Sequence, residues 1–284
     1  MFIKYFYKQP YALIKYVIIY LITAYLLIYL MDFRMVVGDV SVMNNSEYAT
    51  PFLWVHLFSE GSLTEIIQWT FLGFSVGLSA FYAGMLKEER KEMPTGFLLL
   101  SLGLLIMFME DTGNLRHMIS DNTAMIMMKD PYSIEWKQSL ARTGIEMSIY
   151  AALGMVMLSA FHRIIRDRNE NKQAKIFMAA GFVLYGVAAF ASATRNVGDW
   201  YIRAGTQLML MLDGSHMIDH YEKFNPPKPL GFWFMDFVLE ETIELLGAVL
   251  ILTSIILFVK HYFTEKKSLD ETQRKTHVPS SFFP

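Results

Sequence analysis

Several acidic side chains of this chain stand at the ends of apolar segments, where ionised groups are costly. The stretch "FVLEETIELLGAVLILTSIILFVKHY" (237–262) begins with Glu240, Glu241 and Glu244 and continues as a long apolar run. The same placement recurs in three other apolar segments, at Glu65, Glu110 and Glu146. Ionisable residues inside a membrane usually face the bundle interior or an aqueous cavity, and they mark functional sites. We therefore expect a cation-binding or metal-binding site rich in carboxylates.

A carboxylate-bridged pair of metal ions takes glutamates from four packed helices, together with histidines. The sequence predicts that the residues in direct contact with the metal are Glu65, Glu110, His117, Glu146, Glu241 and Glu244. Iron, copper, manganese and zinc are the candidate metal ions, and the site would be redox-active with some of them. These glutamates lack the Glu-x-x-His motif that such sites commonly use. The apolar spans carry no central histidine for a haem, and no glycine-rich nucleotide loop is present.

A second group of charged residues is expected to orient these ligands, and it comprises Asp111, Arg142, Arg195 and Asp199. The arginines are equally suited to ion pairs that join the helices, because a guanidinium can bridge several carboxylates. Asp236, Glu240 and Glu244 recur every four residues and share one face of a regular helix. On such a helix only one of Glu240 and Glu241 can point inward with Glu244, and the sequence does not say which.

Six apolar segments are long enough to hold these residues in a bilayer, whose core of about 30 Å needs roughly 20 helical residues. They are residues 11–31, 63–86, 94–113, 142–162, 174–195 and 236–260. The 284 residues are 54% hydrophobic and 18% charged, as in a polytopic membrane protein. The fold class predicted is therefore all-α, an integral membrane bundle of six transmembrane helices. The predicted organisation is a membrane domain at 1–264 and a cytoplasmic tail at 265–284.

Basic residues indicate the orientation of these spans. Lysines and arginines gather near the amino terminus, in "KEERKEM" (87–93), in "HRIIRDRNENKQAK" (162–175) and in "KHYFTEKK" (260–267). With six spans all of these segments fall on one side, which is the cytoplasm by the positive-inside rule. Both termini are thus predicted to be cytoplasmic, in a multi-pass protein of the plasma (inner) membrane. The acidic site then faces the periplasmic or extracellular side.

The depth of each acid follows from the rise of a helix. Glu146 is 17 residues from Arg163, and Glu244 is 16 residues from Lys260. At about 1.5 Å per residue, both lie about 24 to 26 Å from the inner anchor, several ångströms inside the outer boundary of the hydrocarbon. The other acids reach a similar level. We therefore expect a single cluster contributed by five helices.

Two alternative functions fit the same residues. Carboxyls at this depth could serve a proton- or cation-coupled transporter or channel, and the chain could instead be a non-catalytic subunit of a membrane complex. The expected partners are the lipid bilayer and other membrane subunits. A net charge of −2 gives no indication of nucleic-acid binding.

Three short fragments resemble one membrane family. "TEI" (64–66), "NVGDW" (196–200) and "FWFM" (232–235) are similar to the C subunit of the copper-dependent membrane methane and ammonia monooxygenases. They cover less than a tenth of the chain. The resemblance implies a helical membrane subunit and favours a metal site. That family's site uses an aspartate and two histidines at the start of a helix, and the matching stretch here, "DPYSIEWKQSLARTGIE" (130–146), contains no histidine.

Overall fold

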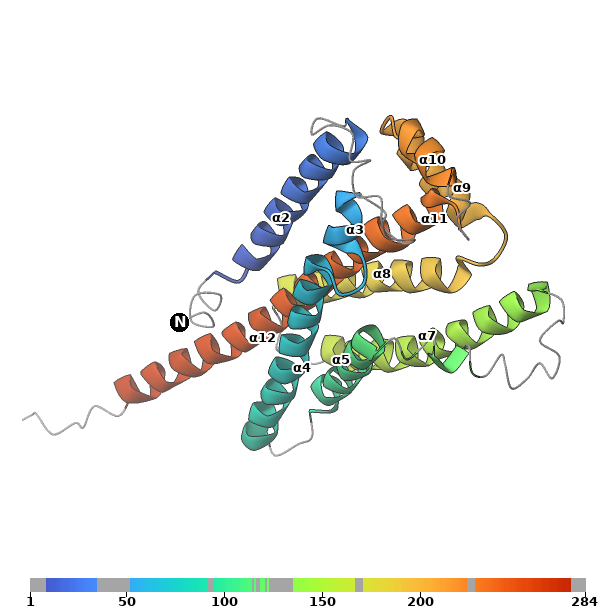
Figure 1. Ribbon diagram of the computed structural model, residues 1–284. Helices are drawn as coiled ribbons and strands as arrows, with labels where there is room; N and C mark the ends of the chain where they lie inside the picture. The colour runs from blue at the N-terminus through green and yellow to red at the C-terminus, as the bar shows by residue number, and fades with distance from the viewer. Residues whose placement is uncertain are drawn as a thin grey trace, which may run out of the picture.

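The computed structural model describes residues 9–34, 52–90, 94–113, 135–166, 171–223 and 228–276, together with Leu115, residues 118–120 and Asn122. Every regular element within these residues is a helix (Figure 1). Six helices are long and apolar enough to cross a membrane. The prediction of an all-α polytopic membrane protein is therefore confirmed in its fold class and in its number of spans.

The spans observed match the predicted segments closely. They are built from α2 (Ala12–Ile28) with the π-helical turn η1 (Tyr29–Phe33), α4 (Leu63–Arg90), α5 (Thr95–Gly113), α7 (Glu135–Arg166), α8 (Lys172–Thr194), and α11 (Leu230–Trp233) continued by η3 (Phe234–Glu240) and α12 (Glu241–Thr276). Helix α12 continues to Thr276, past residue 265, where the sequence predicted the tail to begin. The division into domain and tail, and the cytoplasmic side of the termini, stay predictions.

Three short helices lie outside the membrane-length segments or precede them. Helix α3 (Leu53–Phe58) comes just before α4, while α9 (Trp200–Met211) and α10 (Ser215–Glu222) follow α8. Figure 1 shows α9, α10 and α11 grouped beside one end of α12. The carboxylate of Asp32, at the end of the first span, accepts hydrogen bonds from the backbone N–H groups of Leu53 (2.9 Å) and Trp54 (3.0 Å). This cap fixes the start of α3 against the first span.

Helix α12 is the central helix of the bundle. It packs most extensively on α8 and also contacts α2 and α4, while α5 lies between α4 and α7. Small residues allow the closest approach: a Cβ at Gly181 would lie 2.6 Å from Cγ1 of Ile251 and 2.9 Å from the carbonyl oxygen of Gly247. Helices in lipid associate through such close van der Waals packing, because the hydrophobic effect does not drive them together there.

The start of the last span is a π-helix rather than a regular α-helix. Residues Phe234–Glu240 form η3, and α12 begins at Glu241. A π-helix closes its hydrogen bonds between residues i and i+5, so its turns are wider and it shifts the register of the residues that follow. The prediction that Asp236, Glu240 and Glu244 share one helix face assumed a regular α-helix. That assumption is wrong here, because Asp236 and Glu240 lie in a π-helix.

Candidate functional site

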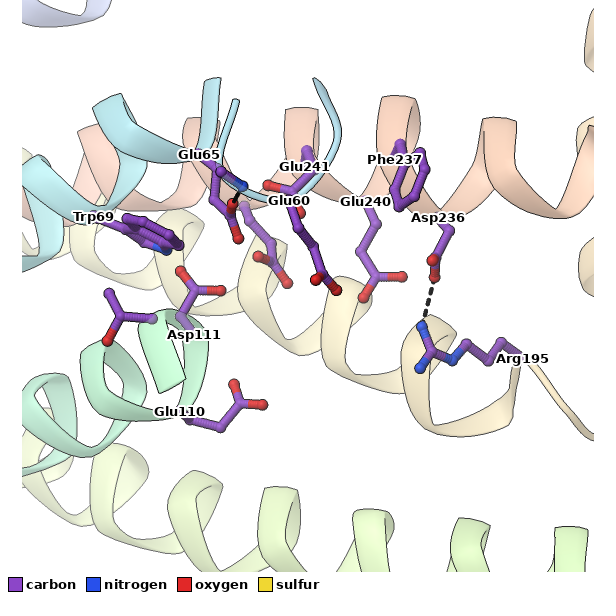
Figure 2. A pocket seen from close by; sticks show the side chains of 13 residues that line it. Glu60, Glu65, Trp69, Glu110, Asp111, Arg195, Asp236, Phe237, Glu240 and Glu241 are labelled. Carbon is purple, nitrogen blue, oxygen red and sulfur yellow. Dashed lines mark hydrogen bonds and ion pairs between the residues drawn. The ribbon is translucent and has the colours of Figure 1, made fainter. Parts of the chain in front are cut away.

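A cavity of about 360 Å³ lies where several helices end (Figure 2). Of the lining residues that the structure describes, eight are acidic and one, Arg195, is basic. The lining comprises Glu60, Gly61, Glu65, Trp69, Glu110, Asp111, Thr112, Arg195, Asp236, Phe237, Glu240, Glu241 and Glu244. We call this the acidic cavity. Among the described residues, carboxyl groups therefore predominate in the wall of this cavity.

Four parts of the fold position these side chains. The first turns of α4 and the loop before it provide Glu60, Glu65 and Trp69, and the last turn of α5 provides Glu110 and Asp111. Arg195 stands just after α8, and η3 with the first turn of α12 carries the remaining four acids. The site therefore combines helix ends that are up to 184 positions apart in the sequence, from Glu60 to Glu244.

The Gln68 side chain joins three helices next to the cavity. Its amide nitrogen donates hydrogen bonds to Oδ2 of Asp111 at 2.7 Å and to Oε2 of Glu244 at 2.8 Å. Gln68 is fully buried. One neutral donor group therefore holds a carboxylate of α5 beside a carboxylate of α12. Hydrogen bonds to charged acceptors are among the stronger ones in proteins, which makes this arrangement rigid.

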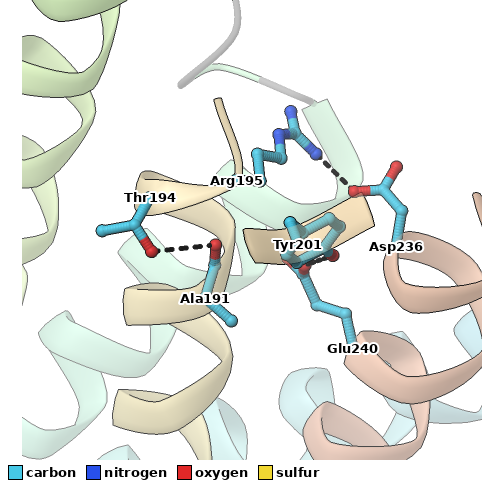
Figure 3. Close-up of polar contacts among 6 residues, drawn as sticks. All are labelled: Ala191, Thr194, Arg195, Tyr201, Asp236 and Glu240. Carbon is cyan, nitrogen blue, oxygen red and sulfur yellow. Dashed lines mark hydrogen bonds and ion pairs between the residues drawn. The ribbon is translucent and has the colours of Figure 1, made fainter. Parts of the chain in front are cut away.

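Two contacts fix the acids of η3 (Figure 3). Nη1 of Arg195 lies 2.6 Å from Oδ1 of Asp236, and the Tyr201 hydroxyl donates a hydrogen bond to Oε2 of Glu240 at 2.9 Å. Tyr201 belongs to α9, outside the spans, and it is almost completely buried. Burial, together with the nearby Glu240 carboxylate, raises the pKa of Tyr201 above its ordinary value. Tyr201 therefore stays a neutral hydrogen-bond donor toward the acidic cavity.

Glu65 is held by the turn that precedes α4. Its carboxylate accepts a hydrogen bond from the backbone N–H of Gly61, a contact drawn in Figure 2. Gly61 has a φ of 75°, a left-handed conformation that glycine adopts without steric cost. This turn directs a backbone donor at the buried carboxylate and so fixes its position in the cavity wall.

Several polar atoms of the lining residues form no hydrogen bond with the described part of the chain. Oε2 of Glu241 and Nε1 of Trp69 are both inaccessible to solvent and form no hydrogen bond. Oε1 of the neighbouring Gln68 is also inaccessible to solvent and accepts no hydrogen bond from the described residues. Buried polar groups are nearly always hydrogen-bonded, since leaving one unsatisfied is costly. An unsatisfied carboxylate oxygen in an acidic wall indicates a place for a cationic donor.

Most of the predicted site residues come together here. The acidic cavity is lined by Glu65, Glu110, Asp111, Arg195, Glu241 and Glu244. Glu240 and Glu241 both line it, although the sequence predicted that only one of them would point inward with Glu244. The roles assigned to these residues, as metal ligands or as groups that orient ligands, stay predictions.

Four predicted residues are placed elsewhere or are not described. Glu146 is buried on α7 but is not part of the cavity lining, and the Ser120 hydroxyl lies 3.2 Å from its Oε1. Arg142 is exposed, and Asp199 forms an exposed pair with Arg203 at 2.6 Å. His117, the predicted nitrogen ligand, lies outside the described residues. Within the described part of the chain, no group of three or more His, Asp or Glu side chains is arranged to hold a metal ion.

Gln68, Trp69 and Tyr201 are among the residues of the site that the sequence analysis did not identify. Gln68 and Trp69 follow Glu65 by three and four positions, so they share its face of α4. That spacing was a usable signal. Tyr201 gave no comparable signal, because α9 is a short helix in a loop and its packing on α11 and η3 depends on the tertiary fold.

Comparison of the sequence with protein-family models, curated proteins and solved structures finds no match.

Proposed function

We propose that this polytopic membrane protein binds a cation in the acidic cavity. The observation that carries the proposal is the solvent-inaccessible Oε2 of Glu241, which has no hydrogen-bond partner among the described residues. It lies in a wall to which those residues contribute eight carboxyl groups. A bound cation would supply the hydrogen bond or ligand that this oxygen lacks. The Gln68 bridge supports this function, since it holds Asp111 and Glu244 in fixed positions without neutralising either.

The nature of the cation follows in part from the spread of the acids. Among the described residues, no three carboxylates are arranged around one point as metal ligands would be. A bound iron, copper, manganese or zinc ion stays a prediction. Ammonium groups suit a dispersed set of acceptors, because each carries several N–H donors that reach different carboxylates. Redox chemistry, transport and a role as a subunit of a larger complex also stay predictions.

The test is a binding measurement on the full chain in nanodiscs of zwitterionic lipid. Ethylammonium is titrated by calorimetry, and Mg²⁺, Ca²⁺, Mn²⁺ and Zn²⁺ by equilibrium dialysis, with elemental analysis of the purified protein. Glu241→Gln keeps the shape of the side chain and removes its charge. We expect it to weaken cation binding about tenfold, the loss of one charge-assisted hydrogen bond. Asp219→Asn is the matched control, because Asp219 is an exposed acid of α10 outside the cavity.

Two results would contradict the proposal. One is the absence of saturable binding by any of these cations to the unmodified protein. The other is equal affinity in Glu241→Gln and Asp219→Asn, which would show that the cavity carboxylates do not contact the cation.

A further inference from the structure

A second cavity, of about 260 Å³, adjoins the acidic one and is mainly apolar. Its wall includes Leu72, Met107, Leu153, Met157, Phe182 and Tyr185, from four spans. We call it the apolar chamber. Glu110, Asp111 and Glu244 line both cavities, so the two share a wall of three carboxylates. A molecule that occupied both would need a cationic part on one side of these acids and an apolar part on the other.

The Tyr185 side chain marks the junction between the two cavities. Its hydroxyl is inaccessible to solvent and has no hydrogen-bond partner within the described segments. It also lies within electrostatic range of Asp111, Glu244 and Glu241. Gly247 makes this position possible, because a Cβ there would lie 2.7 Å from Cδ2 of the Tyr185 ring. A polar group placed beside the shared carboxylates could therefore bond to Tyr185 as well.

The wall of the apolar chamber includes exposed residues of α7 and α8, two of the helices long enough to cross a membrane. Its wall includes Leu158, which is 64% exposed, and Gly186, which is also exposed. A Cβ built at Gly154 or Gly186 meets no atom within 4 Å, so the space beside both glycines is open. An apolar chain dissolved in the bilayer can thus enter the chamber sideways without first crossing water.

We propose that the ligand is a single-chain amphiphile with an ammonium head, an assignment that rests on the proposed cation site. The head would lie among Asp111, Glu241 and Glu244, and the Tyr185 hydroxyl oxygen would accept a hydrogen bond from one of its N–H groups. The alkyl chain would fill the apolar chamber. Charge complementarity selects a cationic head. The small volume of the chamber selects one short chain rather than the two chains of a bilayer lipid.

The experiment compares ligands that differ only in tail or in head. The full chain in zwitterionic nanodiscs is titrated with ethylammonium, octylammonium, octanol and octanoate, and the heats of empty nanodiscs are subtracted. Octylammonium should bind saturably and more tightly than ethylammonium. Octanol and octanoate should show no saturable binding, since one lacks the charge and the other carries the wrong sign.

A variant that fills the chamber separates the tail from the head. Gly154→Leu places a side chain in the open space of the wall and should weaken octylammonium binding about tenfold, because the tail loses its packing contacts. It should change ethylammonium binding less than about twofold. Gly186→Leu fills the chamber from α8 and serves if Gly154→Leu does not fold. The matched control is Gly77→Leu, at an exposed and equally open glycine of α4 outside the chamber.

The outcomes distinguish this inference from the proposed function. If ethylammonium binds but octylammonium binds no more tightly, or if both chamber variants match Gly77→Leu, the amphiphile is wrong and the cation site stands. Octanol binding as tightly as octylammonium would overturn the cationic head. A metal ion that binds in stoichiometric amount and is not displaced by octylammonium would also overturn it. If none of the cations binds, the proposed function itself fails.

Discussion

The guanidinium of Arg195 lies 2.6 Å from the carboxylate of Asp236, at the point where α8 ends and the π-helical start of the last span begins. Their side chains are only 14% and 13% exposed. The pair therefore joins two spans and also sets the position of η3, which presents Glu240 and Glu241 to the acidic cavity.

Arg195→Met should destabilise the protein by about 3 kcal/mol, because it leaves the Asp236 carboxylate largely buried without its partner. The free energy of unfolding in mixed micelles, measured by titration with SDS, checks this. The double variant Arg195→Met/Asp236→Leu should recover much of the loss, since it removes the unpaired charge. A double variant that is less stable than either single variant would show that the pair does not act as a unit.

Gly181→Leu should destabilise the bundle by about 3 kcal/mol, because its side chain would collide with Ile251 and with the backbone of Gly247. The same SDS titration measures it. Gly77→Leu is the control, at a helical glycine with open space around it. Similar losses in both variants would indicate that helix propensity, rather than the close contact of α8 with α12, sets the effect.

Asp32→Asn should cost about 1 kcal/mol, since an amide can accept only one of the two backbone hydrogen bonds that the carboxylate accepts from Leu53 and Trp54. Asp213→Asn is a fitting comparison, because Asp213 forms an exposed pair with Arg34 that adds little stability. Asparagine also tolerates the positive φ of 67° at that position. Equal unfolding free energies for the two variants would contradict the capping role of Asp32.

Tyr201 gives the protein a dependence on alkaline pH. Because burial and Glu240 raise its folded-state pKa, the unfolded chain loses the Tyr201 proton first, near the ordinary value of 10.0. The folded state then binds more protons than the unfolded state, so this contribution to stability is complete below pH 10 and is lost as the pH rises. The loss follows a slope of about 1.4 kcal/mol per pH unit.

Tyr201→Phe should remove this part of the pH dependence of stability. The measurement is the free energy of unfolding between about pH 9 and pH 11. Glu240→Gln should retain most of it, because burial of Tyr201 is the largest cause of the shift. An unchanged slope in Tyr201→Phe would show that other groups produce the alkaline loss.

The sequence by itself determined the spans and the level of the acids. Bilayer thickness fixes how many apolar residues a helix needs, so six runs of about 20 residues could be counted directly. The constant rise of a helix then placed Glu65, Glu110 and Glu244 at a common level, and the structure brings all three to one cavity. Both inferences depend only on distances along single helices.

Only the tertiary structure decided which side chains meet at that level. Direction around each helix depends on its neighbours: Glu146 has a suitable depth but lies on α7 beside Ser120, whereas neutral Gln68 bridges two of the acids. The π-helical η3 changes the register of Asp236 relative to the acids of α12, and both Glu240 and Glu241 line the wall. Packing between helices sets the rotation of each helix about its axis and the register of its residues. The depth of a residue along its own helix carries no information about either.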